Sequence, residues 1–315
     1  MKILFTGGSS FTGLWFIREL AAAGHEVVAT FRHRPEGYPD AMRRQRVELA
    51  VRSCRGVFAC SFGDPQFIEL ARQEPWDLLC HHAADVTNYR SASFDVPGAV
   101  ANNTRNIDAV LGAMQSRGRA RLLATGSVFE DDEGAGSEER PAFSPYGRSK
   151  ALTYQLLRQR AVLAGVPLGK FVIPNPFGPY EEARFTAHLM RKWFAGETAA
   201  VNTPDYVRDN IHVSLLAKAY ARFAGQLAAS TAELRIGPSG YAESQGAFAL
   251  SFAKEMQPRL GLACRVELKE QQDFSEPRIR INTDPLDPRE LRWDEARAWD
   301  EVAAFYESEL RSGAA

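Results

Sequence analysis

The feature that most constrains the fold of this chain is the glycine-rich segment TGGSSFTG, residues 6–13. It follows a short apolar run, KILFT, and precedes a stretch in which Leu14, Ile17 and Ala21 share one helical face. Gly24 ends this predicted helix before the next apolar run, HEVVATF. A strand, a tight turn, a helix and a second strand within about 30 residues make a βαβ unit, which requires a parallel sheet.

Apolar runs of this kind recur along the chain with helical stretches between them: HEVVATF, GVFAC, DLLCH, ARLLAT, GKFVIP and AELRIG. Runs that are apolar on both faces suit a parallel sheet covered by helices on each side. With 315 residues, 45% of them hydrophobic, the chain is long enough to bury a large core. We therefore predict an α/β fold built on a doubly wound parallel sheet.

The regular alternation of strands and helices loosens near residue 175, where Pro-rich and charged stretches such as NPFGPYEEAR appear. We expect residues 1–174 to form a dinucleotide-binding domain, to which segments near 203–236 return. Residues 175–315 should form mainly a smaller, interleaved substrate-binding lobe, because open α/β folds bind ligands at the carboxyl edge of the sheet. The acidic stretch at residues 130–139 is expected to be a solvated loop.

The net charge and the spacing of the cysteines limit which partners, compartment and metal sites we expect. The formal net charge of −1 offers no broad attraction for nucleic acid or anionic membranes, so neither is expected as a partner. No basic leader and no run of 18 apolar residues appears, and we expect a cytoplasmic protein. The cysteines lack metal-ligand spacing and should be free thiols in a reducing compartment: Cys54, Cys60, Cys80 and Cys264. We expect no metal site, since the adjacent His81 and His82 should point to opposite faces of their strand.

The glycine turn has the layout of a dinucleotide-binding turn with one departure. Gly7 occupies the position of the tight turn, and Gly13 the position of close packing between helix and strand. Ser10 stands where a glycine would let the backbone approach the pyrophosphate. Its hydroxyl could donate to a phosphate oxygen at the helix N-terminus. The cofactor-binding residues predicted here are Gly7, Ser10, Phe11, Thr12 and Gly13. A tight connection without a ligand remains the alternative.

The end of the second predicted strand bears on the choice of cofactor. A carboxylate there would favour the ribose hydroxyls of NAD, whereas an arginine accommodates the 2′-phosphate of NADP. The sequence has Phe31 at this point, followed by Arg32 and Arg34. We therefore predict that Arg32 binds NADP, with NAD as the alternative cofactor. Two solvated surface arginines are the alternative reading of the same pattern.

The segment SPYGRSKALTYQLL contains an acid–base pair. Tyr146 and Lys150 lie four residues apart at the start of a predicted helix, so both side chains emerge on one face. A neighbouring ammonium stabilises a phenolate, and the phenol could then exchange a proton with a substrate hydroxyl or carbonyl. The preceding predicted strand, ARLLATGS, ends in the hydroxyl residues Thr125 and Ser127.

Together these segments resemble the extended short-chain dehydrogenases/reductases of the NAD(P)-dependent nucleotide-sugar epimerase/dehydratase family. The segments that carry the resemblance occur in the family's order: TGGSSFTG, DLLCHHAA, ANN at residues 101–103, TGSVFE, YGRSK, NPFGPY and RDNIHV. They cover roughly residues 1–215. The resemblance implies a Rossmann-like fold with a smaller C-terminal substrate-binding lobe.

The resemblance also assigns roles to residues. Thr125 would bind the reacting oxygen, Tyr146 would be the general acid/base, and Lys150 would bind the cofactor ribose. Asn103 would lie near the nicotinamide and Asp64 near the adenine, although a buried structural amide and a helix cap are their alternatives. Ala83 and Ala84 would line the cofactor between pyrophosphate and ribose.

The same resemblance points to a nucleotide-sugar substrate. Arg208 occupies the place of an arginine that binds the substrate diphosphate, and Asn175 that of an asparagine beside the same phosphates. An ion pair with Asp209 or another local carboxylate is the alternative for Arg208. The remaining residues predicted to bind substrate are Ser127, His188 and Arg280.

The residues after Thr125 bear on the reaction. The family's 4,6-dehydratases have Asp-Glu there, whereas this chain has Gly126-Ser127, so elimination of water lacks its acid and base. We therefore predict an NAD(P)-dependent enzyme that reduces a 4-keto sugar, with a 4-epimerase as the alternative. A non-catalytic NADP-binding sensor is an alternative of another class, which Ser10 and Ser214 mildly favour. The helices after Asn103 and Tyr146 commonly form the family's dimer interface, so we also expect a homodimer.

Overall fold

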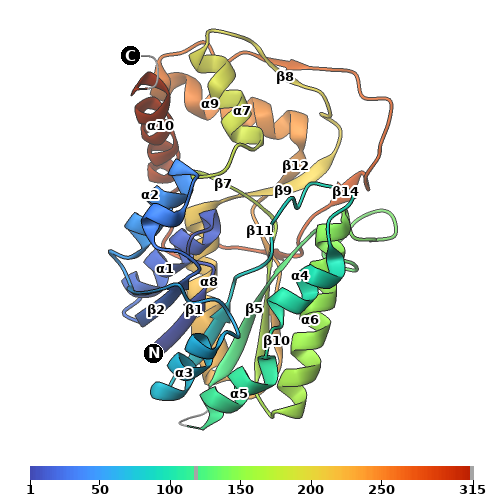
Figure 1. Ribbon diagram of the computed structural model, residues 1–315. Coiled ribbons are helices and arrows are strands. Elements are labelled where there is room, and N and C mark those ends of the chain that lie inside the picture. Colours follow the sequence, from blue (N-terminus) through green and yellow to red (C-terminus); the bar gives the residue numbers. More distant parts are fainter. Residues whose placement is uncertain (117–119, 313–315) are drawn as a thin grey trace. The chain divides into compact units, whose positions relative to one another are not determined.

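The computed structural model describes residues 1–116 and 120–312, which divide into two compact units. Unit 1 comprises residues 1–133, 141–173 and 217–237. Unit 2 comprises residues 134–140 and 174–216, together with the described residues from 238 onward. Each unit has its own sheet and its own core (Figure 1).

Unit 1 is built on a parallel sheet that has seven strands in the described part of the chain. In sheet order these are β10 (Leu234–Ile236), β6 (Leu168–Ile173), β5 (Arg121–Ser127), β4 (Leu78–His81), β1 (Lys2–Thr6), β2 (Glu26–Phe31) and β3 (Arg55–Phe58). Every neighbouring pair is parallel. The strand order reverses between β1 and β4, which is the point where doubly wound folds bind ligands. The predicted α/β, Rossmann-like fold is confirmed.

Helices cover both faces of this sheet. They are α1 (Phe11–Ala22), α2 (Ala41–Ala50), α3 (Pro65–Gln73), α4 (Val96–Asn103), α5 (Ile107–Gln115), α6 (Pro145–Leu163) and most of α8 (Val213–Ala229). Neighbouring residues of β1 show the two faces, because successive side chains of a strand point in opposite directions. Phe5 contacts Tyr220 of α8, whose ring stacks on Phe16 of α1 at 3.9 Å between centroids. Leu4 belongs to the core on the other face.

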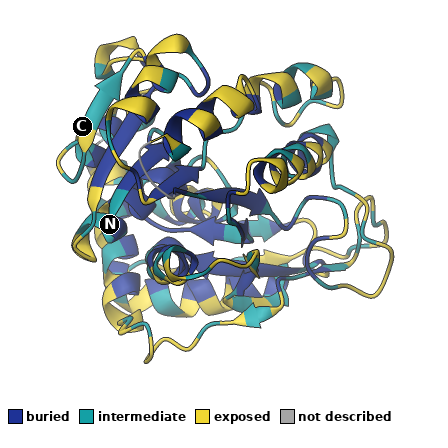
Figure 2. Cartoon of the chain, turned by 90° about the horizontal axis from the view of Figure 1, so that it is seen from below, coloured by how far each residue is buried: buried dark blue, intermediate teal, exposed yellow. Residues whose placement is uncertain are grey.

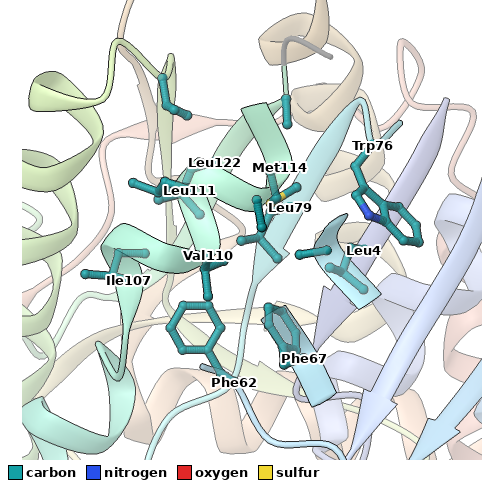
Figure 3. Close-up of a cluster of buried hydrophobic side chains, with 14 of the residues drawn as sticks. Leu4, Phe62, Phe67, Trp76, Leu79, Ile107, Val110, Leu111, Met114 and Leu122 are labelled. Atoms are coloured by element: carbon teal, nitrogen blue, oxygen red, sulfur yellow. The ribbon is translucent and has the colours of Figure 1, made fainter. Parts of the chain in front are cut away.

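That second core joins the sheet to α3, α5 and α6. Phe67 of α3, Val110 of α5 and Leu157 of α6 are buried in one cluster with Leu4 and Leu79 of the strands. Figure 3 shows Phe62, Phe67 and Val110 gathered over these strands. In Figure 2 the strands are mostly buried, and the exposed residues lie on the outer faces of the helices and in the loops. Burial of the apolar strand faces is what fixes the register of the sheet.

Unit 2 has an aromatic core of its own. Its helices are α7 (Phe185–Phe194), α9 (Gln245–Leu260) and α10 (Glu295–Ser312), and the first residues of α8 also belong to it. In its main sheet, β9 (Val207–His212) pairs with β7 (Asn175–Phe177), β12 (Tyr241–Ser244) and β14 (Ile279–Arg280). Two further pairs are β8 (Ala199–Val201) with β13 (Val266–Leu268), and β11 (Pro238–Ser239) with β15 (Asp284–Pro285). Phe177, Phe248, Phe252 and Trp299 contact one another in the core.

The acidic stretch at residues 130–139 differs from the expected solvated loop. Glu130 is fully buried and Glu133 is 7% exposed, because the ammonium of Lys170 on β6 lies between them. Lys170 Nζ donates to Glu130 Oε2 at 2.6 Å and to Glu133 Oε1 at 2.7 Å. Opposite charge compensates for the lost hydration of these carboxylates, so the interpretation as a solvated loop was wrong for Glu130 and Glu133.

The four cysteines are free thiols, as predicted. Three of them are buried, and Cys54 is partly exposed. In the residues that the structure describes, no helix is both long and apolar enough to cross a membrane.

Candidate functional site

The glycine turn between β1 and α1 is closed by its own backbone. Gly7 has a φ of +84°, and a Cβ at this position would lie 2.7 Å from the nitrogen of Ala83. A Cβ on Gly13 would lie 2.2 Å from the carbonyl oxygen of Gly7. Both positions therefore require glycine. A dinucleotide-binding turn needs this close approach of the backbone beside the N-terminus of α1.

Ser10 is the N-cap of α1. Its Oγ accepts a hydrogen bond from the Gly13 amide at 3.1 Å and donates to the Gly7 carbonyl at 2.9 Å. We expected the Ser10 hydroxyl to donate its proton to a phosphate oxygen. In the structure this proton points instead to the Gly7 carbonyl of the turn. Phe11 is buried at the start of the helix, and Thr12 is 9% exposed.

The loop after β4 is tied to β1 through Thr6. The Thr6 hydroxyl accepts hydrogen bonds from the amides of His82 and Ala83, at 3.1 and 3.0 Å. His81 Nε2 lies 2.8 Å from the carbonyl of Asn103, which can only accept, so Nε2 carries the proton and Nδ1 accepts from Thr6 at 3.0 Å. Burial lowers the pKa of His81 to about 4 and keeps the ring neutral. These bonds hold Ala83 against the glycine turn, with Ala84 following it.

His82 points to the other face of β4 from His81. Its Nε2 lies 3.1 Å from Ser10 Oγ and 3.0 Å from Thr12 Oγ1, and its Nδ1 lies 3.1 Å from Thr125 Oγ1. Removal from water, aided by the positive charge of Lys150, lowers the pKa of His82 to about 3. A neutral imidazole therefore connects the glycine turn to the end of β5.

Lys150 and Thr125 meet at the carboxyl end of β5. Lys150 Nζ donates a hydrogen bond of 2.5 Å to the Thr125 carbonyl, and both residues are buried. Burial lowers the pKa of Lys150, the Glu130 carboxylate raises it, and the positive charge of Lys170 lowers it further. Tyr146 lies one helical turn before Lys150 on α6, as the spacing predicts.

The ring of Tyr146 packs in a small aromatic cluster. It makes edge-to-face contacts with Tyr89, at 5.6 Å between centroids, and with Phe94, at 5.9 Å. Ser127 follows Thr125 by two residues and forms a turn: its Oγ accepts from the Phe129 amide, and its own amide donates to Glu130 Oε1 at 2.8 Å.

Three other residues of unit 1 that we predict to bind the cofactor follow β2, precede α3 and end α4: Arg32, Asp64 and Asn103. Arg32 is exposed after β2. Burial raises the pKa of Asp85, but hydrogen bonds from Thr87 and Asn102, and to a smaller extent the positive charge of Arg32, lower it below its usual value. Asp64 stands at the N-cap position of α3 without a capping bond, and it pairs with Arg105 at 2.6 Å. Asn103 is 5% exposed; its Oδ1 accepts from the Asp85 amide and its Nδ2 donates to Thr153. The amide of Asn103 is therefore held by the protein's own groups.

The remaining predicted substrate residues belong to unit 2. Asn175 on β7 lies opposite Asn210 on β9, and in the described part of the chain the Nδ2 atoms of both are buried without a hydrogen-bond partner. Arg280 on β14 is in register with Arg208 on β9 and is fully buried. His188 is an exposed residue of α7.

Arg208 makes many bonds within unit 2. Its Nη1 donates to the carbonyls of Val207, Pro277 and Arg278, and its Nη2 donates to Glu276 at 3.0 Å. Its guanidinium also lies over the ring of Tyr206. The alternative stated for Arg208, an ion pair with a carboxylate of the protein, is present, and its partner is Glu276 rather than Asp209.

Sequence reasoning considered His82 only as a metal ligand and assigned no role to Thr6. The hydroxyl residues at the ends of β1 and β5 were the available signal, because parallel strands end at one edge of the sheet. Among the residues that the structure describes, no cluster of three or more His, Cys, Asp or Glu could hold a metal ion.

Comparison with known families decides the relationship of this chain. A model of the NAD-dependent epimerase/dehydratase family matches residues 3–237, which include the glycine turn, β4, β5 and the start of α6. The chain belongs to this family. Members of the family are NAD(P)-dependent enzymes of the short-chain dehydrogenase/reductase type, so the resemblance seen in the sequence is confirmed. A comparison with curated proteins finds no match.

Several solved structures share the fold of this family member. A UDP-glucose-4-epimerase from Stenotrophomonas maltophila, with bound NAD and formylated UDP-arabinopyranose, has a TM-score of 0.72 and 21% identity, covering 99% of each chain. A UDP-glucose 4-epimerase from Brucella ovis in complex with NAD has a TM-score of 0.73 and 19% identity, covering 98% of each chain. A UDP-glucuronic acid 4-epimerase from Bacillus cereus has a TM-score of 0.70 and 16% identity, covering 98% of this chain and all of the other.

Proposed function

We propose that this family member is an NAD(P)-dependent oxidoreductase that transfers a hydride at a carbon of a nucleotide-linked sugar, with Tyr146 as general acid. The observation that carries the proposal is the bond from Lys150 Nζ to the Thr125 carbonyl, one helical turn from Tyr146. It brings an ammonium, a hydroxyl residue and the helix that carries a phenol to the carboxyl end of β5, beside the strand-order reversal of the sheet.

The geometry of unit 1 fits a dinucleotide. The close backbone approach at Gly7 and Gly13 leaves the N-terminus of α1 as an anion site for a pyrophosphate. In this proposal Phe11, Thr12, Ala83 and Ala84 line the cofactor, Asp64 lies toward its adenine, and Asn103 lies toward its nicotinamide. Arg32 binds the 2′-phosphate of NADP, and Lys150 donates to ribose hydroxyls. The bound nicotinamide supplies the hydride.

The chain's own residues then handle the proton. Tyr146 gives its phenolic proton to the carbonyl oxygen as that oxygen becomes a hydroxyl, and the positive charge of Lys150 favours the phenolate that remains. Thr125 binds the reacting oxygen by a hydrogen bond once that oxygen has become a hydroxyl. Ser127, Asn175, His188, Arg208 and Arg280 are the proposed substrate residues. Arg208 would have to exchange its Glu276 partner for a phosphate to act in this way.

Net reduction of a 4-keto sugar with NADPH is the reaction that we favour, because an exposed arginine follows β2 where an acidic residue would favour NAD. A 4-epimerase that retains NAD is the second candidate. The similar structures named above favour it, since all three are 4-epimerases with NAD bound.

The test measures cofactor binding and turnover separately. NADH and NADPH are titrated by fluorescence, and oxidation of NADPH is then followed with uridine-, thymidine- and guanosine-diphosphate-linked 4-keto sugars. Conversion of UDP-glucose to UDP-galactose without net cofactor change would identify the epimerase instead. Tyr146→Phe should lower either rate by about 100-fold or more. Tyr89→Phe, in the same aromatic cluster, is the matched control and should leave the rate near that of the wild type.

Two outcomes would contradict the proposal. Turnover that Tyr146→Phe does not change would exclude the phenol as the acid. Tight binding of NADPH without turnover of any substrate in the panel would favour a non-catalytic sensor.

We also propose that the enzyme is a homodimer through the outer faces of α5 and α6. Leu152 and Leu163, three turns apart on α6, are 40% and 72% exposed, and Val162 is 67% exposed. The outer residues of α5 include the small Ala109 and Gly112. An exposed apolar stripe beside small residues suits helix-to-helix contact between two copies.

A further inference from the structure

His82 connects two parts of the proposed site that come from different strands. Its Nε2 contacts Ser10 and Thr12 of the glycine turn, and its Nδ1 contacts Thr125 at the end of β5. The rings of Phe5 and Phe16 pack against the imidazole, with centroids 5.7 and 5.1 Å away. The ring is therefore held in one orientation with hydroxyl groups on both of its nitrogens.

The hydrogen-bond partners of Ser10 fix the tautomer of the His82 imidazole. The Ser10 hydroxyl has one proton, and its shorter contact, 2.9 Å, is with the Gly7 carbonyl, which can only accept. Toward His82, Ser10 Oγ is then an acceptor, so Nε2 must carry the N–H. A neutral imidazole has only one N–H, and Nδ1 is left as an acceptor. The hydroxyl of Thr125 consequently donates its proton to His82 Nδ1.

An anion at the turn would reinforce this arrangement. When Thr12 donates its hydroxyl proton to an anion such as a pyrophosphate, Thr12 Oγ1 faces Nε2 as an acceptor, as Ser10 Oγ already does. Both the Ser10 and the Thr12 hydroxyl oxygens then accept from Nε2, so both favour the tautomer with the proton on Nε2. The pKa of His82, near 3, keeps the ring neutral, so it orients its neighbours rather than storing a proton.

We propose that His82 is a positioning residue: it directs the hydroxyl proton of Thr125 away from the reacting carbon and couples Thr125 to the pyrophosphate-binding turn. This inference rests on the proposed function for the role of Thr125. Its consequence is that Thr125 Oγ1 acts as a hydrogen-bond acceptor toward the substrate and favours the alcohol form of the reacting carbon. The proton needed by a carbonyl oxygen must then come from Tyr146 alone.

The first experiment reads the tautomer without any substrate. The imidazole ¹⁵N resonances are recorded for the uniformly labelled protein, free and with NADH, and His82→Gln assigns the His82 signals among the 6 histidines. We expect a protonated Nε2 and an unprotonated Nδ1 in both states at neutral pH. Thr125→Val should shift mainly the Nδ1 resonance, and Thr12→Val mainly the Nε2 resonance. A protonated Nδ1, or a charged ring, would overturn the proposal.

The second experiment uses two matched variants. The amide of His82→Asn reaches about as far as Nδ1 and keeps a partner for Thr125, whereas that of His82→Gln reaches about as far as Nε2 and keeps a partner for the turn. We expect His82→Asn to weaken NADH binding about five- to tenfold and His82→Gln to change it less than about twofold. Equal NADH affinities in the wild type and both variants would refute the coupling. Thermal unfolding checks that both variants are folded.

The two experiments separate this inference from the proposed function. If neither NADH nor NADPH binds the wild-type protein, the proposed function fails and the coupling to the turn fails with it. The tautomer of the free protein is measured in any case, and it decides whether His82 directs the hydroxyl proton of Thr125.

Discussion

The ammonium of Lys150, on α6, donates a hydrogen bond of 2.5 Å to the backbone carbonyl of Thr125, on β5. An ammonium has three N–H donors, so this bond leaves others for the hydroxyls of a bound ribose. Because the bond ends on the backbone, it holds Lys150 without using the Thr125 side chain. The same strand thus anchors the cation and presents the hydroxyl.

Replacing Lys150 separates catalysis from stability. We expect Lys150→Met to lower turnover by about 100-fold. Burial lowers the pKa of Lys150. The buried positive charge of Lys150 therefore lowers the free energy of unfolding at pH values below this lowered pKa. That destabilisation disappears as the pH rises above the lowered pKa, because the folded state then loses the proton. The methionine variant should therefore be at least as stable as the wild type in urea unfolding at neutral pH. A large loss of stability would show that Lys150 is mainly a structural residue.

Arg32 should set the choice between the two cofactors. Arg32→Ala removes the proposed partner of the 2′-phosphate, so the dissociation constant for NADPH should rise about tenfold while that for NADH stays nearly constant. Arg34→Ala is the matched control, because Arg34 is also exposed but lies over the ring of Phe58. Fluorescence titration with both cofactors measures these constants. A wild-type preference for NADH would contradict the assignment.

Much of the sheet could be predicted because its strands are buried on both faces and read as apolar runs. The glycine turn could be predicted because Gly7 and Gly13 allow an approach of the backbone that a Cβ would block. The contacts of His82 could not be predicted. The alternation of side chains along a strand indicates which face a residue points to, but not which hydroxyl groups it contacts there. Those hydroxyls come from residues 70 positions before it and 43 positions after it.

The two buried carboxylates of the acidic stretch, Glu130 and Glu133, were missed for a related reason. Glu130 looks like a solvated carboxylate until Lys170, 40 residues later, is placed beside it. Gly126 makes room for this pair, since a Cβ there would lie 2.7 Å from Cε of Lys170. An ion pair between distant residues leaves no local signature in the sequence.

This buried ion pair should be costly to break from one side. Lys170→Met leaves Glu130 and Glu133 buried without their shared cation, and we expect a loss of about 3 kcal/mol in the free energy of unfolding. Adding Glu130→Gln should restore part of that loss. Lys192→Met breaks the exposed pair with Glu197 and should cost less than about 1 kcal/mol. Equal effects of the two lysine substitutions in urea unfolding would contradict this prediction.

The proposed dimer can be tested by placing a charge on α6. Leu163→Glu puts a carboxylate into the exposed apolar stripe, so it should shift the sedimentation coefficient from that of a dimer to that of a monomer. Leu250→Glu, at a 50% exposed leucine of α9, is the control and should leave the oligomeric state unchanged. A wild-type protein that sediments as a monomer would contradict the proposed assembly.

Glu181 should make unit 2 less stable as the pH rises. Its carboxyl group is buried between α7 and α10, where Oε1 accepts hydrogen bonds from Thr186, at 2.6 Å, and from Tyr306. Burial raises the pKa of Glu181 from 4.5 to about 7, so the folded state binds more protons than the unfolded chain between these two values.

The free energy of unfolding should therefore decrease by about 3 kcal/mol from pH 4.5 to pH 7 through this residue, and change little above pH 7. Glu181→Gln cannot ionise, so the difference in unfolding free energy between wild type and variant should vary with pH across this window. Glu182→Gln, at the neighbouring carboxylate that pairs with Arg184, is the control and should show no such dependence. Urea unfolding followed by tryptophan fluorescence at several pH values gives these differences, and a constant difference for Glu181→Gln would show that the carboxyl group titrates in its ordinary range.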